Sequence, residues 1–322
     1  MKHNFLKLIL CAACVCVGSR SAPATPLYRA EVMADPAWLL HLDCDALRPT
    51  AVGKYILAEM DKPEAKAKLA AFQTIFGLDL RTQLHGVTLY GSSSSPADGV
   101  LIVQADFDPE RLLTLARAAK DFKSNTRNKH EIYSWIDDKK PAKDGVQPRV
   151  YAAIQGERVI FGQREDPVAA ALDVLDGTTP SLAAGKTFPD LGGSVNGNIV
   201  EAAARKFNLP NADPGATILK LSKSAQAVLA VNQQQCQGTL TLVADNEEVA
   251  GNINSIAQGL VALMKLQTNK PEAVKLANAI VIRQDGAKIM GNVKLPVGEV
   301  VEMMKADAAR KAAALEKKDA KE

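Results

Sequence analysis

The segment "RVYAAIQGERVIFGQREDPVAAALDVLDG", from Arg149 to Gly177, contains the unit from which the fold is predicted. Two runs rich in β-branched and aromatic residues flank a Gln155-Gly156 turn, which is typical of an antiparallel strand pair. Pro167 stands where the first turn of a helix tolerates proline, and an apolar stripe follows it. The stripe consists of Val168, Ala171, Leu172 and Leu175. The segment therefore predicts a hairpin followed by an amphipathic helix.

The same order of elements recurs elsewhere in the chain. Residues 100–107 form an expected strand that pairs with "GVTLYG", and Asp108 is expected to cap the helix that follows. Residues 226–266 contain two strands around a glutamine-rich turn, and then a helix that we expect Asp245 to cap. Both segments repeat the hairpin-plus-helix unit.

The last unit, residues 278–305, contains the hairpin signal Asp285-Gly286, and Pro296 is expected to open its helix. Strands joined by tight turns form antiparallel sheets, and amphipathic helices cover a face of such sheets. The sequence therefore predicts an α+β protein of antiparallel sheets built from repeated hairpin-plus-helix units, with helices on one face and two related halves. One continuous sheet through both halves remains an alternative.

A turn-rich stretch, residues 176–198, separates the units into two groups. We therefore expect a first α+β half over 25–180 and a second α+β half over 181–305. Residues 306–322 have mixed charge and little apolar content, which predicts a charged tail that is helical or disordered.

The first 24 residues have the features of an export signal. Two lysines precede the short apolar run "LILCAACVCV", and the small residues Ala22-Pro23-Ala24 fit a cleavage site. We therefore expect a signal peptide over 1–24 and an exported protein in the periplasm or outside the cell. An alternative is a lipid anchor attached to Cys14.

The charge balance argues against nucleic acid as a partner. The chain has 39 Lys+Arg and 36 Asp+Glu, and three of the basic residues but none of the acidic ones lie in the leader. The body of the chain is therefore neutral, whereas binding to phosphate backbones needs clustered positive charge. No apolar run after the leader approaches the length of a membrane span, so we expect a soluble mature chain without a transmembrane segment.

The segment "HLDCDALRPT", residues 41–50, contains the main candidate site. In a strand, alternation places His41, Asp43 and Asp45 on one face, and imidazole and carboxylate groups are suitable ligands for several divalent metals. The other interpretation is that this polar row faces water at the end of the first strand, with Cys44 turned toward the core. Pro49 and Thr50 are expected to begin the next helix.

Further signals of chemistry are absent from the sequence after the leader. It has no H-E-x-x-H, C-x-x-C, G-x-S-x-G or P-loop motif, so we expect no cofactor and assign no catalytic residue. Cys44 and Cys236 are the cysteines that remain after the leader. They could form a disulfide in an oxidising compartment, or they could be two buried thiols.

The order of elements resembles that of a group of exported bacterial proteins of unassigned function that are frequent in planctomycete and verrucomicrobial genomes. The segments that carry the resemblance are "ADPAWLLHLDCDALRPTAVGKYI", "DPVAAALDVLDG" and "DGAKIMGNVKLPVGEVVEMMK". The resemblance covers most of the mature chain. It implies an envelope location and the two-half α+β fold, and it implies no catalytic residues.

Three functions follow as hypotheses from these observations. The first is a non-enzymatic protein of the cell envelope that binds an envelope protein or has a structural role. The second is a carrier of a small apolar or lipid ligand, held between a sheet and its helices. The third is a metal-dependent hydrolase that uses the row of His41, Asp43 and Asp45.

Overall fold

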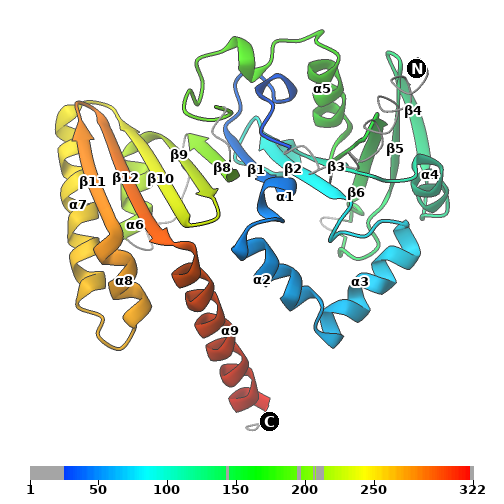
Figure 1. The fold of residues 1–322 in the computed structure, drawn as a ribbon. Helices are drawn as coiled ribbons and strands as arrows, with labels where there is room; N and C mark the ends of the chain where they lie inside the picture. The colour runs from blue at the N-terminus through cyan, green and yellow to red at the C-terminus, as the bar shows by residue number, and fades with distance from the viewer. Residues whose placement is uncertain (1–24, 143–144, 194–196, 206, 208–213, 320–322) are drawn as a thin grey trace, which may run out of the picture.

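A computed structural model describes residues 25–319 except 143–144, 194–196, 206 and 208–213 (Figure 1). The expected signal peptide, with Cys14, lies outside these residues. The strands form one open antiparallel sheet of twelve, in the order β11-β12-β10-β9-β8-β1-β2-β3-β7-β6-β5-β4. This confirms the α+β class and selects the alternative of one continuous sheet.

The strands have these bounds: β1 Trp38–Asp43, β2 Leu84–Gly91, β3 Gly99–Ala105, β4 Lys123–Arg127, β5 His130–Ile136, β6 Arg149–Gln155, β7 Arg158–Gly162, β8 Asn198–Arg205, β9 Ser222–Val231, β10 Gln235–Ala244, β11 Ile280–Asp285 and β12 Lys288–Pro296. The halves of the sheet join where β1, from the first half, pairs with β8, from the second.

The helices have these bounds: α1 Cys44–Leu47, α2 Ala51–Met60, α3 Pro63–Phe76, α4 Pro109–Arg117, α5 Glu165–Leu175, α6 Pro214–Lys220, α7 Glu247–Lys265, α8 Pro271–Ala279 and α9 Val297–Asp319. Short 3₁₀ turns are η1 Arg29–Glu31, η2 Pro96–Asp98 and η3 Leu182–Ala184. Among the described residues, no helix has the length and apolar character that crossing a membrane requires.

The two faces of the sheet differ in composition. One face, here called the α7 face because α7 packs on it, carries Leu40 and its register partners. The residue of this row is apolar in eleven of the twelve strands. The row reads Ser124, Tyr133, Ala152, Phe161, Leu101, Leu89, Leu40, Ala202, Ala227, Leu240, Gly291 and Ile282. The opposite face, here the α5 face, is apolar in the first half and polar in the second, where Thr239 and Asn292 pair across strands.

The core of the first half lies on the α5 face. Leu39, Ile160 and Leu172 are buried there, together with residues of the segments 25–36 and 181–192 that cross the sheet beside α5. Figure 1 shows α5 and the green loop that follows it on one side of the sheet, with α2 and α3 on the other. The sequence predicted helices on one face, and the structure has α5 on the face opposite to α7 because that face is apolar in the first half.

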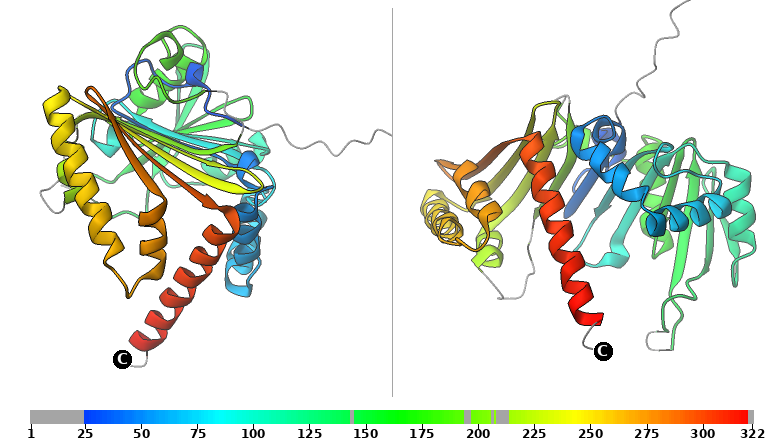
Figure 2. Two further views of the ribbon diagram at one scale, coloured as in Figure 1. Left: turned by 60° about the vertical axis from the view of Figure 1, so that its left-hand side comes forward. Right: turned by 60° about the horizontal axis from the view of Figure 1, so that its bottom comes forward.

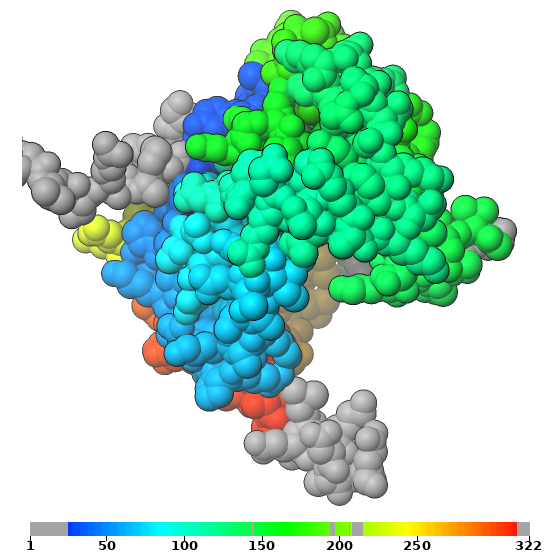
Figure 3. All heavy atoms as spheres, turned by 90° about the vertical axis from the view of Figure 1, so that its right-hand side faces the viewer, coloured from blue at the N-terminus to red at the C-terminus, as the bar shows by residue number. Residues whose placement is uncertain are grey.

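The core of the second half lies on the α7 face, where α6, α7 and α8 pack against β9 to β12. The right-hand view of Figure 2 shows α9, α2 and α3 in front of the same face. Figure 3 shows the outer end of the first half, with α2 and α3 in blue to cyan beside the teal and green residues of the edge strands.

Most local features of the predicted units are found in the structure. Asp108 accepts hydrogen bonds from the first turn of α4, and Thr50 caps α2 by accepting from Gly53 N at 3.0 Å. The cap of α7 is Asn246 rather than Asp245, since the Asn246 side chain accepts from Val249 N at 2.9 Å. Pro296 ends β12, and α9 begins one residue later.

The border between the halves lies later in the chain than the predicted position, 180/181. Leu182, Phe188 and Leu191 belong to the core of the first half, and Leu182 N donates to Val32 O at 2.8 Å. The second half therefore begins with β8. The expected charged tail is helical as far as the structure describes it, because α9 extends to Asp319.

Candidate functional site

The polar row of the first strand is buried, which corrects the expectation that it faces water. His41 is 3 % exposed and Asp43 2 %, whereas Leu40, on the face expected to be inward, is 41 % exposed. Alternation along β1 was therefore predicted correctly and its direction was not. The reason is nonlocal, because the segment 25–36 and the loop 181–192 cover this part of the α5 face.

His41 forms contacts through both of its ring nitrogens. Its Nδ1 lies 2.9 Å from Thr88 Oγ1 on β2, and its Nε2 lies 2.9 Å from the carbonyl oxygen of Thr25. Burial lowers the pKa of His41 and outweighs the neighbouring carboxylates, which raise it. His41 therefore connects the incoming chain to the sheet as a neutral imidazole and has no free nitrogen for a metal.

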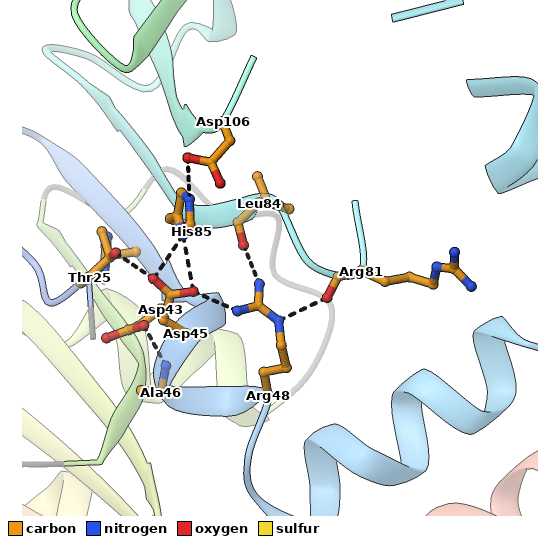
Figure 4. A network of polar contacts seen from close by, with 10 residues as sticks. Thr25, Asp43, Asp45, Ala46, Arg48, Arg81, Leu84, His85 and Asp106 are labelled. Carbon is orange, nitrogen blue, oxygen red and sulfur yellow. Dashed lines mark hydrogen bonds and ion pairs between the residues drawn. The ribbon is translucent and has the colours of Figure 1, made fainter. Parts of the chain in front are cut away.

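Asp45 lies in the first turn of α1, outside the strand, at the centre of a second network (Figure 4). Its carboxylate accepts from Thr25 Oγ1 at 3.0 Å and from Arg48 Nη1 at 2.7 Å. His85 Nδ1 lies 3.0 Å from the same carboxylate, and His85 Nε2 lies 3.0 Å from Asp106 Oδ1. Each oxygen of Asp45 thus has at least two partners.

The charges of this network determine the protonation of His85. Burial lowers the pKa of His85, but its hydrogen bonds with Asp106 and Asp45 outweigh burial, so the pKa is raised overall. The protonated imidazole bridges two carboxylates that come from α1 and from the residue after β3. Arg48 adds contacts to Arg81 O at 2.8 Å and Leu84 O at 2.7 Å, which fix the chain that enters β2.

Asp43 and Glu201 are the most deeply buried carboxyl groups of the α5 face. Asp43 Oδ1 accepts from Ala46 N at 2.7 Å and caps α1, while Glu201 Oε2 accepts from Gly192 N at 2.7 Å. Burial raises the pKa of both side chains, and this exceeds the lowering by their hydrogen bonds. Glu201, which lies beside His41 on β8, had no signal in the sequence beyond an acid within an alanine-rich strand.

The described residues contain no group of three or more His, Cys, Asp or Glu side chains arranged to hold a metal. The polar atoms of the predicted row are also engaged, with His41, Asp43 and Asp45 each bonded to backbone or side-chain partners. These contacts attach Thr25 and α1 to the sheet, and Glu201 attaches Gly192 in the same way. The geometry therefore favours a structural role for the cluster.

The two cysteines are free in the structure. Cys44 begins α1 and is half-buried, which corrects the expectation that it points inward from the strand. Burial raises the pKa of the Cys44 thiol to about 11, and burial also raises the pKa of Cys236. Neither thiol is therefore activated as a nucleophile at neutral pH.

An apolar cavity of about 460 Å³ lies between α7 and the second half of the sheet. Its walls come from strands β8 to β12, from Ile218 of α6 and from Ala257, Leu260 and Val261 of α7. The sequence predicted a helix over these residues and, as the second functional hypothesis, a ligand site between a sheet and its helices. The cavity arises because α7 buries only Ala250 and Ile253, both in its first two turns.

A second apolar cavity, of about 360 Å³, lies on the same face of the first half. α3 and α4 cover it, and Tyr133, Trp135 and Phe161 of the sheet line it. α3 has no fully buried residue, and Arg111 of α4 holds its end by donating to Ile75 O at 3.0 Å. Both halves thus leave apolar space between helix and sheet on the α7 face.

No family model and no curated protein matches the chain. Among solved structures, three crystal forms of TP0453 have a similar arrangement. Form III has a TM-score of 0.46 and 13% identity over 87% of this chain and 98% of that one. Form I has 0.44 and 11% over 86% and 96%, and form IV has 0.41 and 12% over 89% and 99%. At these values no residue role is transferred from TP0453.

Proposed function

We propose that this chain is a non-enzymatic binding protein that holds a small apolar ligand in the cavity beneath α7. The observation that supports this proposal most strongly is the composition of the cavity wall. Of the 18 residues that line it, none is charged and only Thr239 and Asn292 are polar. The side chains of these two residues lie on the α5 face, where Thr239 Oγ1 donates to Asn292 Oδ1 at 3.0 Å, so they add no polar side chain to the cavity wall.

The size of the cavity suits a small molecule. Its volume of about 460 Å³ lies within the range of roughly 300–1,000 Å³ that ligand pockets usually have. Water inside such a wall finds few hydrogen-bonding groups, so an apolar ligand that displaces it gains free energy. Each methylene group buried in this way contributes about 0.8 kcal/mol. A ligand of a few carbon atoms in chain or ring form therefore gains useful affinity from burial alone.

The way α7 is attached supports entry of a ligand. The first two turns are fixed by buried Ala250 and Ile253 and by the Asn246 cap. Toward its other end the helix carries Leu263, which is 61 % exposed. Leu266, the C-cap residue directly after the helix, is 75 % exposed. This end contributes no fully buried residue, so it is held less firmly than the first two turns.

We also propose that binding takes place after export, in the periplasm or outside the cell. The support for this location is the leader-type sequence of residues 1–24. Cell fractionation checks it: the processed chain is expected outside the cytoplasm, and full-length chain retained in the cytoplasm would contradict it.

Binding of an apolar fluorescent probe tests the ligand proposal. Leu260 lines the cavity, so Leu260→Trp fills it and is expected to weaken probe binding at least tenfold. Leu263→Trp is the matched control, because it places the same side chain one turn along on the exposed side of α7. Equal affinity in the two variants would show that the probe binds elsewhere. Circular dichroism establishes that both variants are folded.

A further inference from the structure

A cavity of about 630 Å³ with a strongly basic wall lies where strands β8, β9, β10 and β12 meet the loop 186–190. It is separate from the apolar cavity, and no residue lines both. Five of its lining residues are cations and one is an acid, Asp190. The cations are Lys186, Arg205, Lys220, Lys223 and Lys288.

The floor of this basic cavity is one row of register partners on the α5 face. Arg205 pairs with Ser224, Ser224 with Val243, and Val243 with Lys288. Neighbouring strands are about 4.8 Å apart, so the two cations of the row have Cα atoms about 14 Å apart. Because Ser224 and Val243 are smaller than the cations that flank them, the row forms a trough with a positive side chain at each end.

The wall of the trough is held in place by Asp190. Its backbone N donates to Gln226 Oε1 at 3.1 Å, and Gln226 Nε2 donates back to Asp190 Oδ2 at 3.3 Å. Gln226 is buried, and Lys288 Nζ lies 3.2 Å from the same Asp190 oxygen. The single carboxylate of the lining is thus shared between a buried amide and one of the cations.

Acids outside the lining neutralise part of its charge. Asp35 pairs with Arg205 at 2.6 Å, and Asp245 pairs with Lys223 at 3.0 Å. The positive charges of the lining still outnumber these acids, although the chain as a whole carries 39 basic and 36 acidic residues. The lining of this cavity therefore carries an excess of positive charge.

We propose that this cavity binds a small organic anion with two or more carboxylate or phosphate groups. Lysine and arginine side chains form charge-assisted hydrogen bonds with such groups. More than one anionic group is required because the cations stand at opposite ends of the trough and on its loop wall. The volume exceeds the size of a single inorganic ion and lies in the range of small-molecule pockets.

Isothermal titration at constant ionic strength tests this site, with citrate, inorganic phosphate and acetate as probes. Citrate is expected to bind at least tenfold more tightly than acetate, and inorganic phosphate to lie between them. This order of affinities distinguishes a site for a molecule with several anionic groups from a site for a single ion such as inorganic phosphate. Acetate that binds as tightly as citrate, or inorganic phosphate that binds more tightly than citrate, would overturn the proposal.

Two variants locate the binding. Lys288→Gln removes a cation from the trough, and Asp190 loses its ion pair with that cation. The affinity for citrate is therefore expected to fall about tenfold or more. Lys294→Gln is the control, because Lys294 is exposed on the same strand and the same face and does not line the cavity. Equal losses in both variants would indicate only general attraction between charges and would overturn the proposal.

Lys186→Gln removes a cation from the loop wall, and Lys186 forms no ion pair with any residue the structure describes. It therefore changes the charge of the cavity without breaking an internal contact, and the affinity for citrate is again expected to fall. Unchanged affinity in both Lys186→Gln and Lys288→Gln, with the variants folded by circular dichroism, would rule out this cavity as the site.

Discussion

α5 in the first half buries five residues along a helix of 11, whereas α7 in the second half buries two along a helix of 19. Both helices follow a hairpin and both carry an apolar stripe, so the difference does not come from their amphipathicity. It comes from what covers the sheet beside them. The segments 25–36 and 181–192 close the α5 face around α5, and nothing comparable among the described residues closes the space beneath the second half of α7. One helix is therefore part of a sealed core and the other covers a cavity.

The largest expected effect separates these two helices directly. Leu172→Ala in α5 removes a side chain that is 2 % exposed in the main core, and should lower the free energy of unfolding by about 3 kcal/mol. Leu260→Ala in α7 only enlarges an existing cavity, and should cost about 1 kcal/mol. Urea unfolding of the two variants measures both. Equal losses would show that α7 is packed as tightly as α5.

The next largest effect concerns Asp43 and Asp45, the buried acids whose hydrogen bonds hold α1 and the segment around it in place. Asp45→Asn loses the contacts with Arg48 and His85 and should cost about 2 kcal/mol. Asp43→Asn keeps an oxygen that accepts from Ala46 N, and burial already disfavours the Asp43 charge, so its cost should be close to zero. The two substitutions make the same change of atoms, at the N-cap of α1 and in its first turn. A larger loss for Asp43→Asn than for Asp45→Asn would contradict this account of the cluster.

The smallest effect is the pH dependence that His85 contributes. Its pKa is raised in the folded chain, so protonated His85 stabilises the fold fully below the unfolded value of 6.5. That contribution is lost as the pH rises from 6.5 through the raised pKa. His85→Gln should remove this loss, an effect below about 1 kcal/mol for a bridge that reaches the surface. Unfolding midpoints of the wild type and of His85→Gln between pH 6.5 and pH 9 measure it, and identical slopes in these two proteins would contradict it.

His41 contributes the opposite pH dependence of stability, so the effects of the two histidines can be separated. Its pKa is lowered in the folded chain, so the stability it contributes as a neutral group is lost as the pH falls below 6.5. The comparison of wild type with His85→Gln must therefore be made on the alkaline side of 6.5, where His41 is neutral in both states.

The sequence predicts the features that depend on neighbours along the chain. The hairpins that turn at Gly156 and Gly286, the Asp108 cap, the start of a helix at Thr50 and the alternation of β1 all depend on local chemistry, and each is found in the structure, with Gln155 and Asp285 as the last strand residues before their turns. The α+β class follows from them because hairpins imply antiparallel pairing.

The features that depend on distant segments could not be predicted in the same way. Both faces of β1 carry groups that can be buried, and the α5 face is chosen by residues 25–36 and 181–192, which reach it only in the folded chain. Glu201 joins His41 through the β1–β8 pairing, which no local pattern specifies. The cavity beneath α7 likewise depends on the distance between the helix and the sheet. The apolar residues of α7 follow the same sequence pattern whether the space beneath them is filled or empty.

Native mass spectrometry of the protein isolated from the cells that make it tests the central claim most directly. We expect a species heavier than the processed chain by the mass of one apolar molecule, which organic extraction removes and which Leu260→Trp lacks while Leu263→Trp retains it. A single unliganded mass in wild type and in both variants, isolated under the same gentle conditions, would contradict the claim that the cavity beneath α7 is a ligand site.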